Sequence, residues 1–148
     1  MRRRYPAGPV VGVGALVLRR GKVLLVKRGR PPLKGLWSLP GGVLRTGERL
    51  RDGVRREVLE ETGLEVEPAG VFEVFERIQR DAEGRAEYHY VLVDYLCRVK
   101  GGKLSAADDA ERAEWVREAD LEQYAMTEGT LEVIQRALKK GKRRLLRG

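Results

Sequence analysis

The spacing of apolar residues changes once in the first half of the chain, and this change limits the possible folds. Val- and Leu-rich runs at residues 10–18 and 23–26, separated by a polar RRGK segment, predict a β-hairpin. Further along, apolar residues recur about every four positions, at Leu50, Val54 and Val58, which indicates a helix. The chain must therefore join strands to a helix within its first 65 residues.

This helix has clear expected ends, and the chain after it favours more strands. We expect the helix to begin near Arg49 and to end at Gly63, the residue type most common at a left-handed C-terminal cap. A nearly continuous apolar run at residues 88–99 predicts a strand buried on both faces. The other expected elements are strands at 71–79 and 113–116, and a short helical turn at 120–124.

A final helix completes the pattern. Thr127 is a candidate N-cap, and the helix after it would place one apolar stripe against the sheet. The residues of that stripe are Leu131, Ile134, Ala137 and Leu138. Strands alternate irregularly with two principal helices, and there is no internal repeat or linker. We therefore expect an α/β fold with one mixed sheet covered by helices, in a single domain spanning residues 1–148.

The composition excludes several classes of protein. A single cysteine, Cys97, excludes an internal disulfide, and a single histidine, His89, excludes a Cys/His zinc cluster. The chain has no run of the roughly 18 apolar residues that spanning a membrane requires. Its basic N-terminus lacks the small-residue cleavage site of a secretion signal. A cytoplasmic protein without membrane partners is the expectation.

The formal charge of +8 does not by itself indicate nucleic-acid binding. Nine positive charges with no acid among them lie in short basic tails at residues 1–4 and 139–148, and removing them leaves −1 for residues 5–138. Residues 19–56 are basic, with twelve Lys or Arg and two acidic residues. Residues 57–138 are acidic, with nine Lys or Arg and twenty Asp or Glu. We expect solvated tails and a small polyanionic ligand rather than nucleic acid, while the oligomeric state stays open, with a homodimer as one option.

Three carboxylates are crowded on the first helix. At about 100° per residue, and with Val54 at 0°, Glu61 falls at roughly −20°, inside the apolar stripe. Glu57 borders the stripe at roughly −60°, and Glu60 lies at roughly −120°. Burying an unpaired carboxylate costs several kcal/mol. Arg56 lies close to Glu60 but far from Glu61, so arginine cannot neutralise all three. Oxygen ligands at i, i+3 and i+4 instead suit Mg²⁺ or Mn²⁺.

The sequence around these acids resembles a known family. The segment GGVLRTGERLRDGVRREVLEETGL fits the pattern Gly-x5-Glu-x7-Arg-Glu-U-x-Glu-Glu-x-Gly-U, where U is a bulky aliphatic residue. This pattern resembles the Nudix hydrolase family, and no fixed position is missing. The likeness includes the preceding WSLPGG and extends over most of residues 9–138. One detail departs from common family usage, since Gly53 stands where alanine is frequent.

The resemblance implies a Nudix-type α/β/α sandwich that hydrolyses a nucleoside diphosphate linked to another group. It implies that metal is bound by Glu57, Glu61, often Glu60, and the backbone carbonyl of Gly41, the cofactor being Mg²⁺ or Mn²⁺. Glu57 is the first candidate for the general base, with Arg56 and Glu60 as further catalytic residues. The neighbouring Glu48 is a candidate outer partner of this group. A glycine pair would let the backbone approach metal or phosphate closely.

Three further segments, PPLKGLWSLPGG, YHYVLVDYLC and DDAERAEWV, together resemble the ADP-ribose pyrophosphatase-like branch of the family, whose reaction would give AMP and ribose 5-phosphate. Trp37, Gly42 and Arg28 are the predicted substrate-binding residues. Two alternatives stay open: removal of pyrophosphate from nucleoside triphosphates, and a non-catalytic domain that binds nucleotide or RNA. Further candidates are Asp108, Asp109 and Glu111 for assistance to the metal or water, and Phe75, Tyr88 and Tyr90 for base stacking or, alternatively, sheet packing.

Overall fold

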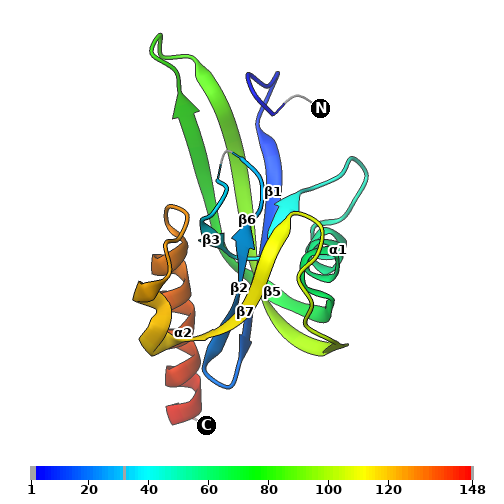
Figure 1. Cartoon of the computed structure of the whole chain (residues 1–148), viewed down its shortest axis with the longest axis vertical. Coiled ribbons are helices and arrows are strands. Elements are labelled where there is room, and N and C mark those ends of the chain that lie inside the picture. The colour runs from blue at the N-terminus through cyan, green and yellow to red at the C-terminus, as the bar shows by residue number, and fades with distance from the viewer. Residues whose placement is uncertain (1–2, 32, 148) are drawn as a thin grey trace.

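A mixed seven-stranded sheet lies between two helices (Figure 1). The computed structural model describes residues 3–31 and 33–147. Its elements are β1 (Val10–Arg19), β2 (Lys22–Arg28), β3 (Trp37–Ser38), β4 (Gly41–Val43), α1 (Leu50–Thr62), β5 (Leu64–Arg80), β6 (Ala86–Gly102), β7 (Ala110–Arg117), the 3₁₀ helix η1 (Glu118–Gln123) and α2 (Thr130–Arg147).

The sheet is mixed because β1 and β6 run parallel while the other pairs are antiparallel. The strand order is β3-β2-β1-β6-β5, with β4 paired to β1 and β7 paired to β2. Along β1 the antiparallel neighbour changes: residues 12–14 pair with β4, whereas Leu18 and Arg19 pair with β2. The short β4 therefore lies next to the middle of the sheet and connects it to the loop that leads into α1.

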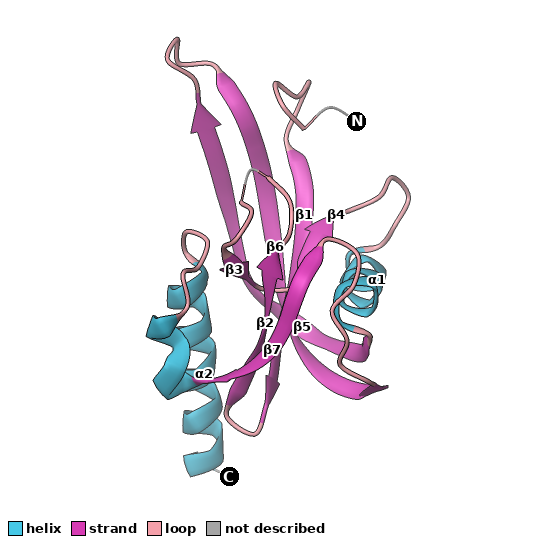
Figure 2. Cartoon of the chain, viewed as in Figure 1, coloured by secondary structure: helices cyan, strands magenta, loops and turns pink. Residues whose placement is uncertain are grey.

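The two faces of the sheet carry separate apolar cores, which makes the expected α/β/α sandwich correct (Figure 2). On one face, Val54 and Val58 of α1 pack with odd-numbered residues of β1 such as Val13. On the other face, Ile134 and Ala137 of α2 pack with even-numbered residues of β1 and β6. This alternation follows from the two-residue period of a strand.

The helices form where the apolar spacing predicts them, with one difference at the start of α2. Gly63 has φ 74°, and its N–H donates to the carbonyl of Leu59 at 3.0 Å, so the expected left-handed cap is confirmed. The second helix begins at Thr130, not directly after Thr127. Gly129 adopts φ 82° in the intervening turn, and the hydroxyls of Thr127 and Thr130 hydrogen-bond to each other at 2.5 Å.

The two longest strands differ most from expectation. β5 begins directly after the cap of α1, seven residues before the expected start at 71, with irregular register around Pro68 and Gly70. The apolar sequence of β6 predicts a strand buried on both faces, and this prediction is wrong for its first part. Residues 86–92 are only half-buried. In this part β5 and β6 form an arm that extends beyond both helices (Figure 1).

The basic segments at both ends of the chain are partly included in the fold. Residues 139–147, expected as a tail, continue α2 as helix. Of the N-terminal tail, residues 1–2 lie outside the described part of the chain, while the Arg4 Nε donates to Glu87 at 2.8 Å. Among the described residues, no helix combines the length and apolarity that crossing a membrane demands.

Candidate active site

Arg56 is the centre of an ion-pair network where α1 faces the loop before it. Its Nε donates to Glu48 Oε2 at 2.6 Å and its Nη2 to Glu48 Oε1 at 2.9 Å, which is a two-point contact with one carboxylate. These hydrogen bonds lower the pKa of Glu48 to about 2. Glu48 thus has the outer, supporting position that its place near the helix start suggests.

The same guanidinium also contacts two of the crowded glutamates. Its Nη1 donates to Glu57 Oε1 at 2.8 Å and to Glu60 Oε2 at 3.3 Å. Burial raises the pKa of Glu57, and the contact with Arg56 only partly opposes this rise. Glu57 is therefore held in one orientation while remaining a better proton acceptor than an exposed glutamate.

Glu61 is the most unusual group of the site because it is 1% exposed and only one of its two carboxylate oxygens accepts a hydrogen bond. Its Oε1 accepts a hydrogen bond from the backbone N–H of Gly41 at 2.8 Å. Its Oε2 has no hydrogen-bond partner among the described residues, and Arg28 Nη1, at 3.8 Å, is too far away to donate one. Burial raises the pKa of Glu61 to about 8.

The two glycines of β4 lie close against their neighbours. A Cβ on Gly41 would lie 2.1 Å from the carbonyl oxygen of Val13, so only glycine fits against β1. A Cβ on Gly42 would lie 2.6 Å from Glu57 Oε1. We expected the pair to admit a metal or phosphate to the backbone. The structure adds another reason, which is that β1 and the Glu57 carboxylate already occupy the adjacent space.

Gly53 has a similar explanation. We considered close approach of the sheet or the substrate as its cause. Instead, a Cβ at this position would lie 2.8 Å from Leu44 Cδ1 and 3.2 Å from Glu48 Oε1, both in the loop before α1. Glycine therefore leaves room for Glu48 to reach Arg56.

An open cavity of about 500 Å³ contains most of the predicted site. It is lined by Gly41, Gly42, Arg56, Glu57, Glu60 and Glu61, together with Arg28 from the end of β2. The aromatic residues Phe75, Tyr88 and Tyr90 of the β5–β6 arm also line it. The fold thus brings together the residues predicted to bind metal and to act in catalysis, and two of the three residues predicted to bind substrate.

Trp37 is the predicted substrate-binding residue that the fold places elsewhere. It is 8% exposed, belongs to the core on the α2 side, and does not line the cavity. Its ring meets that of Tyr124 edge-to-face, with centroids 4.9 Å apart. This position supports a packing role and gives no support to substrate contact.

The acidic residues around the start of β7 divide between the cavity and solvent. Asp108 and Asp109 line the cavity, and the charge of Asp108 adds to the rise in the pKa of Glu57. Asp109 also forms an ion pair with Arg30 at 3.0 Å. Glu111, by contrast, is exposed on β7 and does not line the cavity.

Sequence reasoning missed one acid of the cavity, Asp94 on β6. Asp94 is 5% exposed and lines the cavity. The signal that could have revealed it is an isolated aspartate in the otherwise apolar run YVLVDYLC. A carboxylate in such a strand needs either a partner or a function.

The donor set of the glutamates fits a hard divalent cation, although the groups are not gathered around one point. Among residues 3–31 and 33–147, no three Asp, Glu, His or Cys side chains are arranged to hold a metal ion together. Glu57 and Glu60 face Arg56, whereas Glu61 faces Gly41. The unsatisfied Oε2 of Glu61 and the all-oxygen ligands match what Mg²⁺ or Mn²⁺ prefers.

Residues 8–137 match the family model described as NUDIX domain. The chain belongs to the Nudix family. This Nudix domain is 37% identical over 107 residues to an ADP-ribose pyrophosphatase of Methanocaldococcus jannaschii, covering 72% of this chain and 61% of that protein. The chain spans less than two thirds of the length of the first curated relatives that it matches.

Solved structures of Nudix proteins share the fold. The crystal structure of a MutT NUDIX hydrolase from Burkholderia pseudomallei is 34% identical, with a TM-score of 0.75 and coverage of 86% of this chain and 97% of that one. The NUDIX domain of Shewanella oneidensis NrtR, solved with ADP-ribose, is 25% identical, with a TM-score of 0.70 and coverage of 90% and 88%. Together with the family match, these structures show that the chain has the fold of the Nudix family.

Proposed function

We propose that this Nudix enzyme hydrolyses ADP-ribose to AMP and ribose 5-phosphate with the help of Mg²⁺ or Mn²⁺. The observation that carries the proposal is the buried, unsatisfied carboxylate oxygen of Glu61, next to the basic carboxylate of Glu57 in one cavity. The ADP-ribose pyrophosphatase of Methanocaldococcus jannaschii and the ADP-ribose complex of the Shewanella domain support the choice of substrate.

Glu57, Glu60, Glu61 and the carbonyl of Gly41 are the groups that would hold the cation. When bound, the cation would supply positive charge to the phosphates and lower the pKa of an attacking water. Glu57 then accepts the proton of that water. The water oxygen bonds to one phosphorus as the bond from that phosphorus to the bridging oxygen breaks, giving two phosphate monoesters.

Two arginines have distinct roles in this scheme. Arg56, fixed by its two-point contact with Glu48, orients Glu57 and offsets the repulsion between Glu57 and Glu60. Arg28 lies at the cavity with a side chain that is 28% exposed, and it has no hydrogen bond with Glu61. It is therefore available to bind a substrate phosphate.

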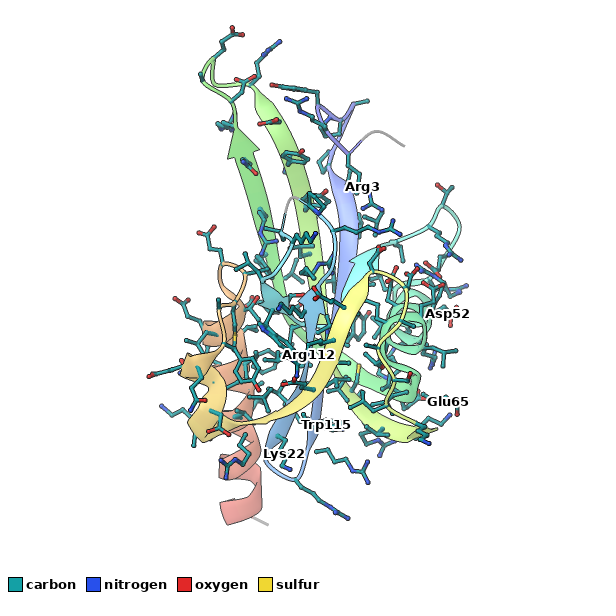
Figure 3. The ribbon with its side chains drawn as sticks, in the orientation of Figure 1. Arg3, Lys22, Asp52, Glu65, Arg112 and Trp115 are labelled. Carbon is teal, nitrogen blue, oxygen red and sulfur yellow. The ribbon has the colours of Figure 1, made fainter. Side chains whose placement is uncertain are left out.

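A substrate panel with product chromatography tests the proposal. Wild type is expected to convert ADP-ribose to AMP and ribose 5-phosphate with Mg²⁺ or Mn²⁺, while Glu57→Gln loses at least 100-fold in kcat. Glu65→Gln is the control, because Glu65 projects from the start of β5 into solvent (Figure 3). Equal activity of Glu57→Gln and wild type would refute the assignment of the base.

The same panel separates the other two functions. Release of pyrophosphate from nucleoside triphosphates, with ADP-ribose left intact, would replace our proposal with a triphosphate pyrophosphohydrolase. Binding of ADP-ribose without turnover of any nucleotide would indicate a non-catalytic domain. A nucleotide as the main partner and a cytoplasmic location are part of the proposal, and a homodimer is not required by it.

A further inference from the structure

The cavity continues past the glutamates along one face of the β5–β6 arm. Alternate residues of β6 share a face, so Tyr90, Leu92 and Asp94 form a row on the cavity floor. Their register partners on β5 are Arg77, Phe75 and Glu73, of which the first two also line the cavity. The floor is therefore mainly aromatic and apolar, and it ends at one carboxylate.

The side chain of Asp94 has no hydrogen bond or ion pair with any residue in the described part of the chain, although the residue is only 5% exposed. The charged residues nearest to it on β5, Arg77 and Glu73, have other partners. Arg77 donates to the carbonyl of Glu128 at 3.1 Å, and Glu73 forms an ion pair with Arg136. Burial raises the pKa of Asp94 to about 6, so the group is mostly ionised at neutral pH.

The strand next to Asp94 has glycines where the side chains of β6 lie close against it. A Cβ on Gly14 would lie 2.3 Å from Asp94 Oδ1, and a Cβ on Gly12 would lie 2.7 Å from Leu92 Cδ2. Both glycines belong to β1 and line the cavity. The glycine backbone of β1 therefore makes room for the Asp94 carboxylate in the part of the cavity that Phe75 and Tyr90 also line.

Asp94 lies at a useful distance from the glutamates that we propose to bind the cation. Gly14 is paired with Gly41 on one side and with Asp94 on the other. Neighbouring strands lie about 4.8 Å apart, so the Cα atoms of Gly41 and Asp94 are separated by about 10 Å. A nucleotide whose diphosphate meets Glu61 can extend its base to Asp94.

We propose that Asp94 recognises the base of the substrate by accepting a hydrogen bond from the exocyclic amino group of adenine. This inference rests on the proposed function and identifies which end of ADP-ribose occupies the β6 floor. The rings of Phe75 and Tyr90 favour a flat base over a sugar at this position. A carboxylate accepts hydrogen bonds and cannot donate them while ionised, which excludes a carbonyl oxygen at the same point.

The test uses a substrate analogue whose base lacks the amino group that would donate to Asp94. In inosine diphosphate ribose a carbonyl oxygen stands where adenine has its amino group. Wild type should favour ADP-ribose over this analogue by at least tenfold in kcat/KM, because a hydrogen bond to a charged group is lost and a repulsion gained. Asp94→Asn should remove or invert the preference, since its amide can donate as well as accept.

Two further variants make the result specific. Glu73→Gln removes a neighbouring carboxylate that does not line the cavity, and it should keep the wild-type preference. Gly14→Ala should weaken the preference by pushing the Asp94 carboxylate aside, and it serves if Asp94→Asn fails to fold. A wild-type preference retained by both Asp94→Asn and Gly14→Ala would overturn the proposal.

Binding of AMP and IMP, measured by calorimetry without metal, separates this inference from the proposed function. Wild type should bind AMP at least tenfold more tightly than IMP, and Asp94→Asn should not. This readout needs no turnover, so it tests the base subsite even if ADP-ribose is not hydrolysed. Equal affinities of wild type for AMP and IMP would refute the subsite while leaving hydrolysis of the diphosphate unaffected.

Discussion

Replacing Glu61 by glutamine should change how folding stability depends on pH in the metal-free protein. Glu61 has a pKa of about 8 in the folded chain, against 4.5 for an ordinary glutamate. Between these two values the folded state holds a proton that the unfolded state releases. Stability from this group is therefore complete below about pH 4.5 and is lost as pH rises toward 8.

The size of the effect follows from the shift in pKa. Each pH unit in this window costs about 1.4 kcal/mol, so wild type should lose roughly 3 kcal/mol between pH 6 and pH 9 from this group alone. Glutamine cannot titrate, yet its side-chain oxygen can still accept the hydrogen bond of Gly41. Glu61→Gln should therefore lack this loss and exceed wild type in stability at pH 9.

Urea unfolding in EDTA at pH 6 and pH 9, followed by tryptophan fluorescence, measures the change. Adding Mg²⁺ at pH 9 should restore stability to wild type and leave Glu61→Gln unaffected, because the cation replaces the proton on Glu61. If the two proteins lose the same stability between pH 6 and pH 9, then Glu61 is not a buried, titrating group and the reasoning fails.

Three further substitutions test other parts of the site. Glu48→Gln should lower the free energy of unfolding by about 1–2 kcal/mol after allowance for solvent screening, and in urea titrations the difference from wild type should vanish as pH falls from 4.5 toward 2. Gly42→Ala should displace Glu57 and reduce kcat by at least tenfold, with a change in Tm of only a few degrees by calorimetry; an unchanged kcat would contradict the packing described. Trp37→Phe should lower Tm while leaving KM for ADP-ribose unchanged in steady-state assays, and a large rise in KM would place Trp37 in substrate binding after all.

The helix and its glutamates were predictable because a helix has a fixed angle per residue. That rule placed Glu61 inside the apolar stripe of α1, and the structure shows Glu61 buried with one oxygen unsatisfied. The same rule separated Arg56 from Glu61, in agreement with its contacts to Glu57 and Glu60. Local geometry was sufficient for this part of the site.

Residues whose role depends on contacts between distant segments were not predictable. An apolar run cannot show which face of a strand is open, so the half-buried arm of β6 and the position of Asp94 were missed. The requirement for glycine at position 41 comes from the carbonyl of Val13, which is distant in sequence. Trp37 could equally have faced substrate or core, and only the packing against Tyr124 decides between them.

Titration with Mn²⁺, followed by electron paramagnetic resonance at pH 8, tests the central claim that the glutamates of α1 form a cation site. Wild type should bind Mn²⁺, and Glu61→Gln should bind it at least tenfold more weakly. Asp52→Asn is the matched control on the same helix, because Asp52 projects away from the cavity and pairs with Arg55 (Figure 3). Equal Mn²⁺ affinity of Glu61→Gln and wild type would contradict the account, whereas loss confined to Glu61→Gln is the result it predicts.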